Sequence, residues 1–128
     1  MQPNEIEFKE WLMKAAEDLS SAKVLFKNKI ISTALYHSQQ CAEKTIKAIL
    51  VKFNQPVPKS HDLAFLSNLT LHFVPKCQST IEKAIFMTSY SWKYRYPGEQ
   101  DDPDISDAEE AIEAAENILI EITKELSK

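Results

Sequence analysis

A single glycine, Gly98, occurs among the 128 residues of this chain. Glycine adopts positive φ angles at no steric cost, so β-rich folds use it repeatedly in tight turns. P-loops and dinucleotide-binding loops each need several glycines at fixed spacing, so this chain contains neither. The scarcity of glycine therefore predicts an all-α fold.

The length predicts one domain over residues 1–128, which buries roughly two thirds of the surface of its unfolded chain. A domain of this size needs no disulfide, so Cys41 and Cys77 are expected to be buried free thiols. No apolar run approaches the roughly 18 residues of a membrane span. Residues 1–10 are acidic and lack the apolar stretch of a signal peptide, which predicts a cytoplasmic protein without membrane contact.

Apolar residues recur every three or four positions, as in amphipathic helices. The pattern predicts four main helices and a short fifth, over about residues 5–28, 32–54, 76–89 and 104–126, with the short one after Ser60-His61-Asp62. Ser32 is expected to cap the second helix, and Asp104 or Ser106 the last. The terminal helices repeat near every 3.5 residues, which predicts shallow packing angles in an antiparallel up-and-down helical bundle.

Charge is distributed unevenly along the chain. Residues 1–98 carry 13 Lys and Arg against 8 Asp and Glu, whereas residues 99–128 carry 2 against 11. The net charge of −4 argues against a diffuse nucleic-acid-binding surface. A local cationic site remains open, and so does a basic face that meets an acidic partner.

Aromatic and cationic residues alternate in the run Tyr90–Gly98, which we call the aromatic loop. It holds the only arginine, three of the four tyrosines and one of the two tryptophans. Such a run suits a surface that stacks on flat rings and pairs with phosphate, with Trp92, Tyr94, Arg95 and Tyr96 as candidate residues. The alternative is a loop whose aromatic rings plug the end of the core, and both interpretations stay open.

A polar ridge is predicted on the second helix, opposite its core stripe. The ridge residues are His37, Gln40, Lys44, Lys47 and Val51. The structural interpretation is a solvent-exposed face on which Glu43 and Lys47 pair at i and i+4. The functional interpretation places His37, Gln40 and Lys44 on a polar surface near the aromatic loop.

Acidic residues follow the aromatic loop, at Glu99, Asp101, Asp102 and Asp104. Mg²⁺ favours carboxylates, but these lack a recognised ligand spacing, and Asp before a helix is commonly a cap. Nothing in the His and Cys spacing indicates zinc. No metal or cofactor is expected.

Four segments, in this order, resemble the HEPN family (higher eukaryotes and prokaryotes nucleotide-binding), in its prokaryotic stand-alone form. They are Ala16-Glu17-Asp18-Leu19, the block from Ala34 to Ala48, Ser60-His61-Asp62-Leu63, and Tyr94-Arg95-Tyr96-Pro97. The resemblance spans nearly the whole chain. It implies a helical bundle that forms a homodimer with a cleft between protomers, often encoded beside a minimal nucleotidyltransferase as a toxin–antitoxin pair.

Active members of the family are metal-independent ribonucleases with an Arg and a following His that are separated by four to six residues. Arg95 matches the arginine, but the positions for the histidine hold Gln100, Asp101 and Asp102. The motif is therefore incomplete, and whether the chain is an enzyme stays open.

Three functions follow from these observations. The first is a homodimer that binds nucleotide or RNA and partners a nucleotidyltransferase: Arg95 pairs with phosphate, the aromatic rings stack on a base, and Lys44 and Lys47 add charge. The second is a ribonuclease toxin with a non-standard base, for which His37 is the candidate. The third is a protein-interaction scaffold. The missing histidine favours the first function over the second. His61 is expected only at the start of the short helix, beside the cap Asp62.

Overall fold

A computed structural model describes residues 3–98 and 101–128. Those residues form α-helices and short 3₁₀ helices and no strand, which confirms the all-α prediction. The elements are α1 (Pro3–Lys27), α2 (Ile31–Lys52), α3 (Leu63–Asn68), η1 (Pro75–Cys77), α4 (Gln78–Glu82), η2 (Ile85–Ser91) and α5 (Ile105–Leu126). None of these described helices is long and apolar enough to cross a membrane.

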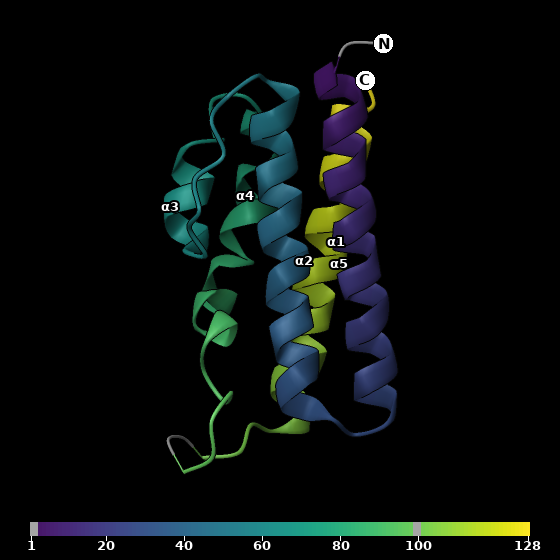
Figure 1. Ribbon diagram of the computed structural model, residues 1–128, viewed down its shortest axis with the longest axis vertical. Helices are drawn as coiled ribbons and strands as arrows, with labels where there is room; N and C mark the ends of the chain where they lie inside the picture. The colour runs from purple at the N-terminus through teal and green to yellow at the C-terminus, as the bar shows by residue number, and fades with distance from the viewer. Residues whose placement is uncertain (1–2, 99–100) are drawn as a thin grey trace.

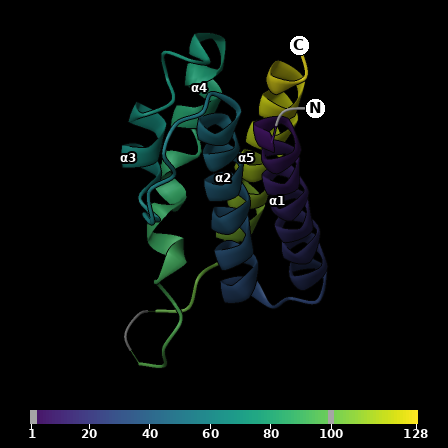
Figure 2. The same ribbon diagram turned by 45° about the horizontal axis from the view of Figure 1, so that its top comes forward.

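The second helix occupies the centre of the bundle. α1 runs antiparallel to α2, and α5 packs against both (Figure 1). The chain between α2 and α5 returns along the other side of α2 as a column of short helices, from α3 to η2 (Figure 2). The connection from α1 to α2 and residues 92–98 after η2 lie at one end of the bundle, and the start of α1 and the end of α5 lie at the other.

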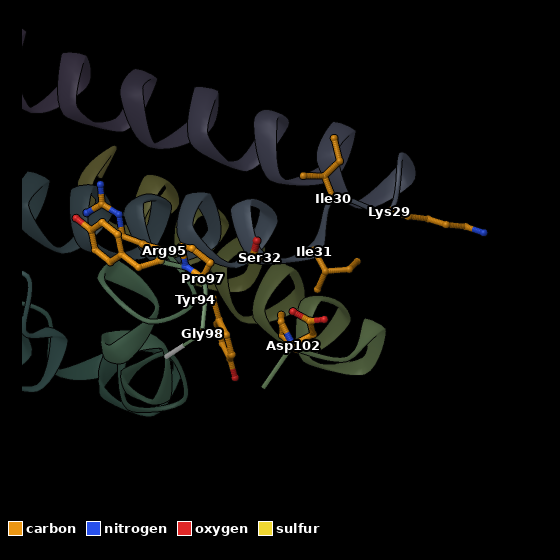
Figure 3. A pocket seen from close by; sticks show the side chains of 11 residues that line it. Lys29, Ile30, Ile31, Ser32, Tyr94, Arg95, Pro97, Gly98 and Asp102 are labelled. Atoms are coloured by element: carbon orange, nitrogen blue, oxygen red, sulfur yellow. The ribbon is translucent and has the colours of Figure 1, made fainter. Parts of the chain in front are cut away.

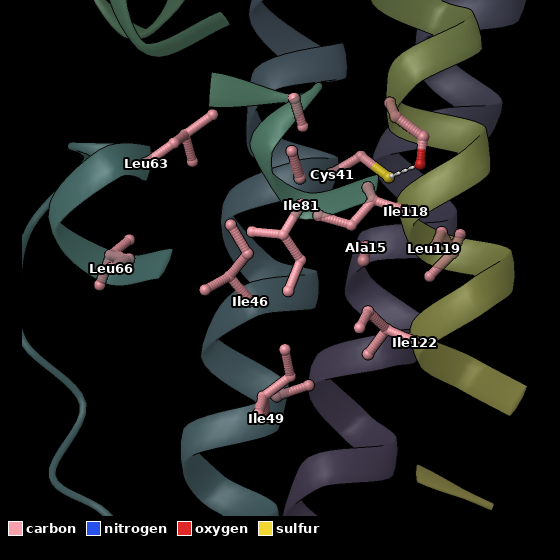
Figure 4. Close-up of a cluster of buried hydrophobic side chains, with 14 of the residues drawn as sticks. Ala15, Cys41, Ile46, Ile49, Leu63, Leu66, Ile81, Ile118, Leu119 and Ile122 are labelled. Atoms are coloured by element: carbon pink, nitrogen blue, oxygen red, sulfur yellow. Dashed lines mark hydrogen bonds between the residues drawn. The ribbon is translucent and has the colours of Figure 1, made fainter. Parts of the chain in front are cut away.

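Every helix of the bundle contributes to one apolar core (Figure 4). The predicted stripes of α1 and α5 supply Phe8, Ala15 and Leu19 on one side and Ala115 and Ile122 on the other. Two apolar residues that the helical repeats place on the core face are exposed instead. Ile105 is 51% exposed, because it is the first residue of α5 and lies at the end of the bundle, and Leu69 is 37% exposed just after α3. The near-3.5 repeat therefore identified the buried faces of both long terminal helices.

The predicted helix over residues 76–89 is wrong as a continuous element. It is divided into η1, α4 and η2, and the turns around Ala84 use 3₁₀ hydrogen bonds. The Thr88 hydroxyl donates to the carbonyl of Ile85 and accepts from the backbone N–H of Leu63 at the start of α3. Hydroxyl groups of Ser and Thr can hydrogen-bond to the backbone and so compete with the regular α-helical hydrogen bonds. Here the Thr88 hydroxyl also joins η2 to the start of α3.

Helix caps follow the prediction at two helices and not at a third. The Asp62 side chain accepts hydrogen bonds at the start of α3, and Asp104 forms a capping box with Asp107 at the start of α5. Ser32 is not a cap, because α2 already begins at Ile31. The cap position is held by Ile30, whose side chain makes no hydrogen bond there.

Both cysteines are free and buried, as predicted. The thiol of Cys41 donates to the carbonyl of Ala115 across the α2–α5 contact, at 3.8 Å (Figure 4). Burial is the main cause that raises the pKa of Cys41 to about 12 and that of Cys77 to about 11. Both groups therefore stay protonated at neutral pH.

Alkaline pH should destabilise the fold through these thiols. An unfolded cysteine ionises near the ordinary pKa of 9.0, whereas folded Cys41 stays neutral up to a pKa of about 12. The free energy of unfolding should thus be unaffected below pH 9.0 and fall as the pH rises from there toward 12. Urea unfolding across this range measures the effect.

The Cys41→Ala variant is the control, because it lacks the ionisable group and should lose less stability over the same pH range. Alkylation provides a second measurement: at about pH 8, both thiols should react with iodoacetamide only after unfolding. Rapid modification of the native protein would contradict their burial.

Candidate functional site

The aromatic loop folds back over the first half of α2. Its first two residues belong to η2, and the chain then turns at Tyr94, whose φ of 66° lies in the left-handed region that bulky residues rarely adopt. This turn brings Arg95 over α2, where its guanidinium carbon lies 5.5 Å from the centroid of the Tyr36 ring. The contact is a cation–π interaction that holds the arginine above the helix.

The residues of the aromatic loop are divided between the core and the surface. Tyr90 and Tyr94 are half-buried and pack against the core, with ring centroids 6.3 Å apart. Burial is the largest of the causes that raise the pKa of Tyr90 above its ordinary value. Trp92 and Tyr96 are 58% and 62% exposed, and Arg95 between them is exposed as well. The loop therefore uses two rings to anchor itself and presents the other two, with the arginine, to solvent.

Arg95 lines three adjoining hollows in the surface. The first hollow, of about 540 Å³, lies between the loop residues 94–98 and the start of α2, at 29–32, with residues 102–103 beside them. Figure 3 shows the side chains of this hollow, with Lys29 extending away from the loop. Among the described residues, the only hydrogen bond of the guanidinium is a long one of 3.5 Å to the carbonyl of Ser91.

Two further hollows are both lined by Tyr36 of α2. The second, of about 450 Å³, is lined by Tyr36, Gln40, Ser60, His61, Asp62, Thr88, Ser91, Trp92 and Arg95. The third, of about 380 Å³, is lined by Ser32, Thr33, Tyr36, His37, Lys93, Tyr94 and Arg95. Tyr36 and Arg95 are common to both, so the arginine lies where the two hollows meet.

His37 and Lys44 share one carboxylate on α1. Asp18 accepts from Nδ1 of His37 at 2.8 Å and, through its other oxygen, from Nζ of Lys44 at 2.6 Å. The Asp18 side chain is only 10% exposed, and the two donors are partly buried at 29% and 28%. The predicted solvent-facing ridge is therefore partly covered by α1 at this point.

Glu43 is the centre of a second polar cluster, on the other side of α2. One of its oxygens accepts from Nδ1 of His61 at 2.8 Å, and the other accepts from Nζ of Lys47 at 2.9 Å. Gln39 donates to the same carboxylate at 3.1 Å, while Gln40 donates to the side-chain oxygen of Gln39 at 2.7 Å. No buried side-chain nitrogen or oxygen of the described residues lacks a hydrogen-bond partner, so the cluster is internally satisfied.

The prediction that the α2 ridge faces solvent is wrong at Lys47, whose side chain is 7% exposed, and at Val51, which is buried. The Glu43–Lys47 pair does form at i and i+4, but inside the protein. The cause is the central position of α2, which has neighbours on both sides. The amine of Lys47 is therefore unavailable to a ligand at the surface.

Most of the predicted site residues do come together. Trp92, Tyr94, Tyr96, His37 and Gln40 each line a hollow that Arg95 also lines. Lys44 and Lys47 do not, because their amines bind Asp18 and Glu43.

The sequence analysis also missed residues of these hollows. Lys29, Lys93 and His61 line them. The signal for His61 was its place in the Ser60-His61-Asp62 segment, just before a capped helix. Its contact with Glu43, 18 positions earlier, has no local sequence signature.

Two residues that follow the aromatic loop, Glu99 and Gln100, lie outside the described residues. Asp101 and Asp102 are exposed, and Asp102 lines the first hollow. Asp104 serves as the α5 cap. Within residues 3–98 and 101–128, no group of three His, Cys, Asp or Glu side chains is arranged as metal ligands would be.

Comparison with known proteins agrees with this architecture. The family model of the HEPN domain matches residues 8–126. MJ1304, a candidate toxin of Methanocaldococcus jannaschii, is 33% identical over 136 aligned positions that cover 92% of this chain and 86% of its own.

Two crystal structures share the fold. That of ST0689, an archaeal HEPN homologue, superposes with a TM-score of 0.70 at 23% identity and covers 93% of this chain and 97% of its own. That of TT1696 from Thermus thermophilus has a TM-score of 0.73 at 24% identity, over 91% and 96% of the two chains.

Replacing Glu43 should destabilise the protein strongly. The Glu43→Gln variant keeps the shape of the side chain but leaves the Lys47 ammonium without a counter-charge in a buried position. We expect the free energy of unfolding to fall by about 3–5 kcal/mol, measured by urea denaturation. The matched control is Glu17→Gln, whose i,i+3 pair with Lys14 is 67% exposed at both side chains and should change stability by less than about 1 kcal/mol. Equal effects of the two changes would mean that water reaches Lys47.

Proposed function

The chain belongs to the HEPN family, and on that premise we propose that it binds RNA, or a nucleotide, through the surface around Arg95. The observation that carries the proposal is the position of this arginine, which lines all three adjoining hollows between the aromatic loop and α2. A cation shared by adjoining hollows is suited to an extended, anionic ligand.

Phosphate is the group that Arg95 would bind. A guanidinium donates two parallel hydrogen bonds to phosphate oxygens, and this planar geometry distinguishes arginine from lysine. The guanidinium carbon lies 5.5 Å from the centroid of the Tyr36 ring, and the Arg95 side chain is exposed and so accessible to a phosphate. Lys93 lines the third hollow and Lys29 the first, so further positive charge is available to neighbouring phosphates.

Bases would stack on the exposed rings of the aromatic loop. Trp92 lines the second hollow and Tyr96 the first, and Arg95 lines both. Stacking of a base on an aromatic side chain contributes about 1–3 kcal/mol and tolerates different sequences. This arrangement favours a short single strand with flexible base identity over a base-specific pocket.

We further propose a role in a two-component, toxin–antitoxin-like system. The similarity to a candidate toxin of M. jannaschii supports it. The partner expected from the family resemblance is a minimal nucleotidyltransferase protein.

Replacing Arg95 should weaken RNA binding and leave the fold intact. The Arg95→Ala variant removes an exposed side chain whose only hydrogen bond among the described residues is 3.5 Å long, so the melting temperature should stay within about 2 °C. Fluorescence anisotropy with a labelled single-stranded RNA should show affinity lower by at least about tenfold, the loss expected for one charge-assisted contact.

Lys124→Ala is the matched control, because it removes one cation from a hollow between α4 and α5 that contains no residue of the aromatic loop. It should bind RNA as the wild type does. Equal loss in both variants would indicate non-specific charge attraction. A large fall in melting temperature for Arg95→Ala alone would show that the arginine stabilises the fold, and this outcome would contradict the proposed binding role.

We also propose that the protein is a homodimer. Two protomers of charge −4 repel weakly, so association must come from apolar contact. The first helix carries Ile6, Met13 and Val24 at 49%, 65% and 61% exposure, and their spacing places them on one face of α1. Light scattering at micromolar concentration should give the dimer mass, and Met13→Glu should shift it toward the monomer. A monomeric wild type would contradict the proposal.

A further inference from the structure

A small hollow, which we call the α1–α2 hollow, lies where these two helices meet. Its volume is about 250 Å³, and it is lined by Glu7, Glu10, Trp11 and Lys14 of α1 and by Lys44 of α2. None of these residues lines a hollow that Arg95 lines, and no residue of the aromatic loop lines this one. RNA binding around Arg95 therefore does not account for it.

Trp11 gives the α1–α2 hollow an aromatic wall. Its side chain is half-buried and packs against the apolar core, so its neighbours hold the ring in place. Of the aromatic side chains, the indole of tryptophan attracts a cation most strongly through the face of its ring. The hollow therefore offers a fixed ring to a cationic group.

The two lysines of the hollow are already paired with carboxylates of α1. Nζ of Lys44 donates to Asp18 at 2.6 Å, and Nζ of Lys14 lies 3.5 Å from a carboxylate oxygen of Glu17. Their positive charges are therefore balanced by neighbours that do not line the hollow. The alkyl stems of both lysines can still cover apolar surface there.

The charges of Glu7 and Glu10 are not balanced in this way. Both side chains are exposed and lie at i and i+3, so they are neighbours on the surface of α1. Within residues 3–98 and 101–128, neither carboxylate makes an ion pair or a hydrogen bond, whereas that of Glu5 on the same helix binds Lys52 at 2.8 Å. Two carboxylates this close repel each other, and a cation placed between them relieves that repulsion.

We propose that the α1–α2 hollow is a docking pocket for an arginine side chain of a protein partner. The guanidinium of the partner stacks on the ring of Trp11 and donates hydrogen bonds to the carboxylates of Glu7 and Glu10. Arginine fits these groups better than lysine does, because its planar guanidinium stacks on aromatic rings and donates paired hydrogen bonds to carboxylates. A guanidinium is also less strongly hydrated than an ammonium, so it enters a hollow at lower cost.

The size of the hollow favours a single side chain as its occupant. Its volume of about 250 Å³ is below the roughly 300–1,000 Å³ of most small-molecule pockets. Tryptophan and arginine are also the residues that most often dominate the affinity of protein–protein contacts. A second copy of this chain has one arginine, Arg95, which lies over Tyr36 in its own protomer. A different protein therefore supplies the arginine, and the inference does not depend on RNA binding.

Trp11 is the reporter for the test. The chain has two tryptophans, so a Trp92→Phe background leaves Trp11 as the only one, and its fluorescence reports on the α1–α2 hollow. The probe is the blocked tripeptide acetyl-Gly-Arg-Gly-amide, titrated at constant ionic strength. Its arginine should change the Trp11 emission in a saturable way. The same tripeptide with glutamine in place of arginine should leave the emission unchanged.

Substitutions in the hollow should separate the carboxylates from the lysines. The variant that carries both Glu7→Gln and Glu10→Gln should bind the arginine tripeptide at least about threefold more weakly, as expected when exposed ion pairs are removed. Its melting temperature should not change, because both side chains are exposed. Lys14→Gln removes a like charge and should bind the tripeptide at least as tightly as the unchanged hollow does. Glu113→Gln is the matched control, because Glu113 is an exposed carboxylate of α5 that does not line the hollow, and it should bind normally.

Four outcomes would overturn the docking pocket. They are an emission that the arginine tripeptide leaves unchanged, equal affinity for the glutamine tripeptide, equal loss of affinity in the Glu113→Gln control, and unchanged affinity when both glutamates of the hollow are replaced. Light scattering tests the other occupant: a change from dimer to monomer mass on replacing these glutamates would place a second copy on the hollow instead. Each of these results leaves the proposed RNA binding in place, because Arg95 and the aromatic loop are not part of this hollow.

Discussion

The second helix is enclosed by the rest of the bundle, so its polar side chains must find partners inside the protein. α1 and α5 cover one side of α2, and the column from α3 to η2 covers the other. An unpaired charge in such a position costs several kcal/mol, whereas a paired and hydrogen-bonded one is tolerated. The pairing of Lys47 with Glu43 and that of Lys44 with Asp18 satisfy this requirement. These pairs in turn fix His61 and His37, and with them the polar walls beside Arg95.

The aromatic loop differs from α2, because it packs against the core and also exposes side chains to solvent. Tyr90 and Tyr94 bury their rings against the core, and the left-handed backbone at Tyr94 reverses the chain direction. Residues held in such a conformation cost about 1–3 kcal/mol and persist only where the surrounding packing fixes them. The stabilisation from the buried rings therefore keeps Arg95 over Tyr36, and the exposed rings contribute little to folding. The aromatic loop thus contributes buried rings to the core and exposed side chains to the surface.

Local patterns predicted the parts of the fold that depend on local physics. The apolar repeats located α1, α2 and α5, and the caps at Asp62 and Asp104 were recognisable because a cap bonds within its own first turn. The segmentation of residues 76–89 was not recognisable, because the Thr88 hydroxyl is shared with Leu63, 25 positions away. The solvent-facing ridge of α2 was wrong for a related reason. Helical periodicity shows which residues share a face and does not show how many faces the neighbours cover.

The sequence by itself determined the all-α class, the long helices and the identity of the aromatic loop, since these follow from glycine scarcity, periodicity and composition. It also identified Arg95 and the rings around it as candidates. The tertiary structure alone decided which of these rings are buried, which lysines are occupied, and where the histidines lie. Those outcomes depend on contacts such as Asp18 with His37 and Glu43 with His61, 19 and 18 positions apart. Such contacts exist only once α1 and the α2–α3 connection have packed on α2, because buried charges take whichever partners the packing brings within reach.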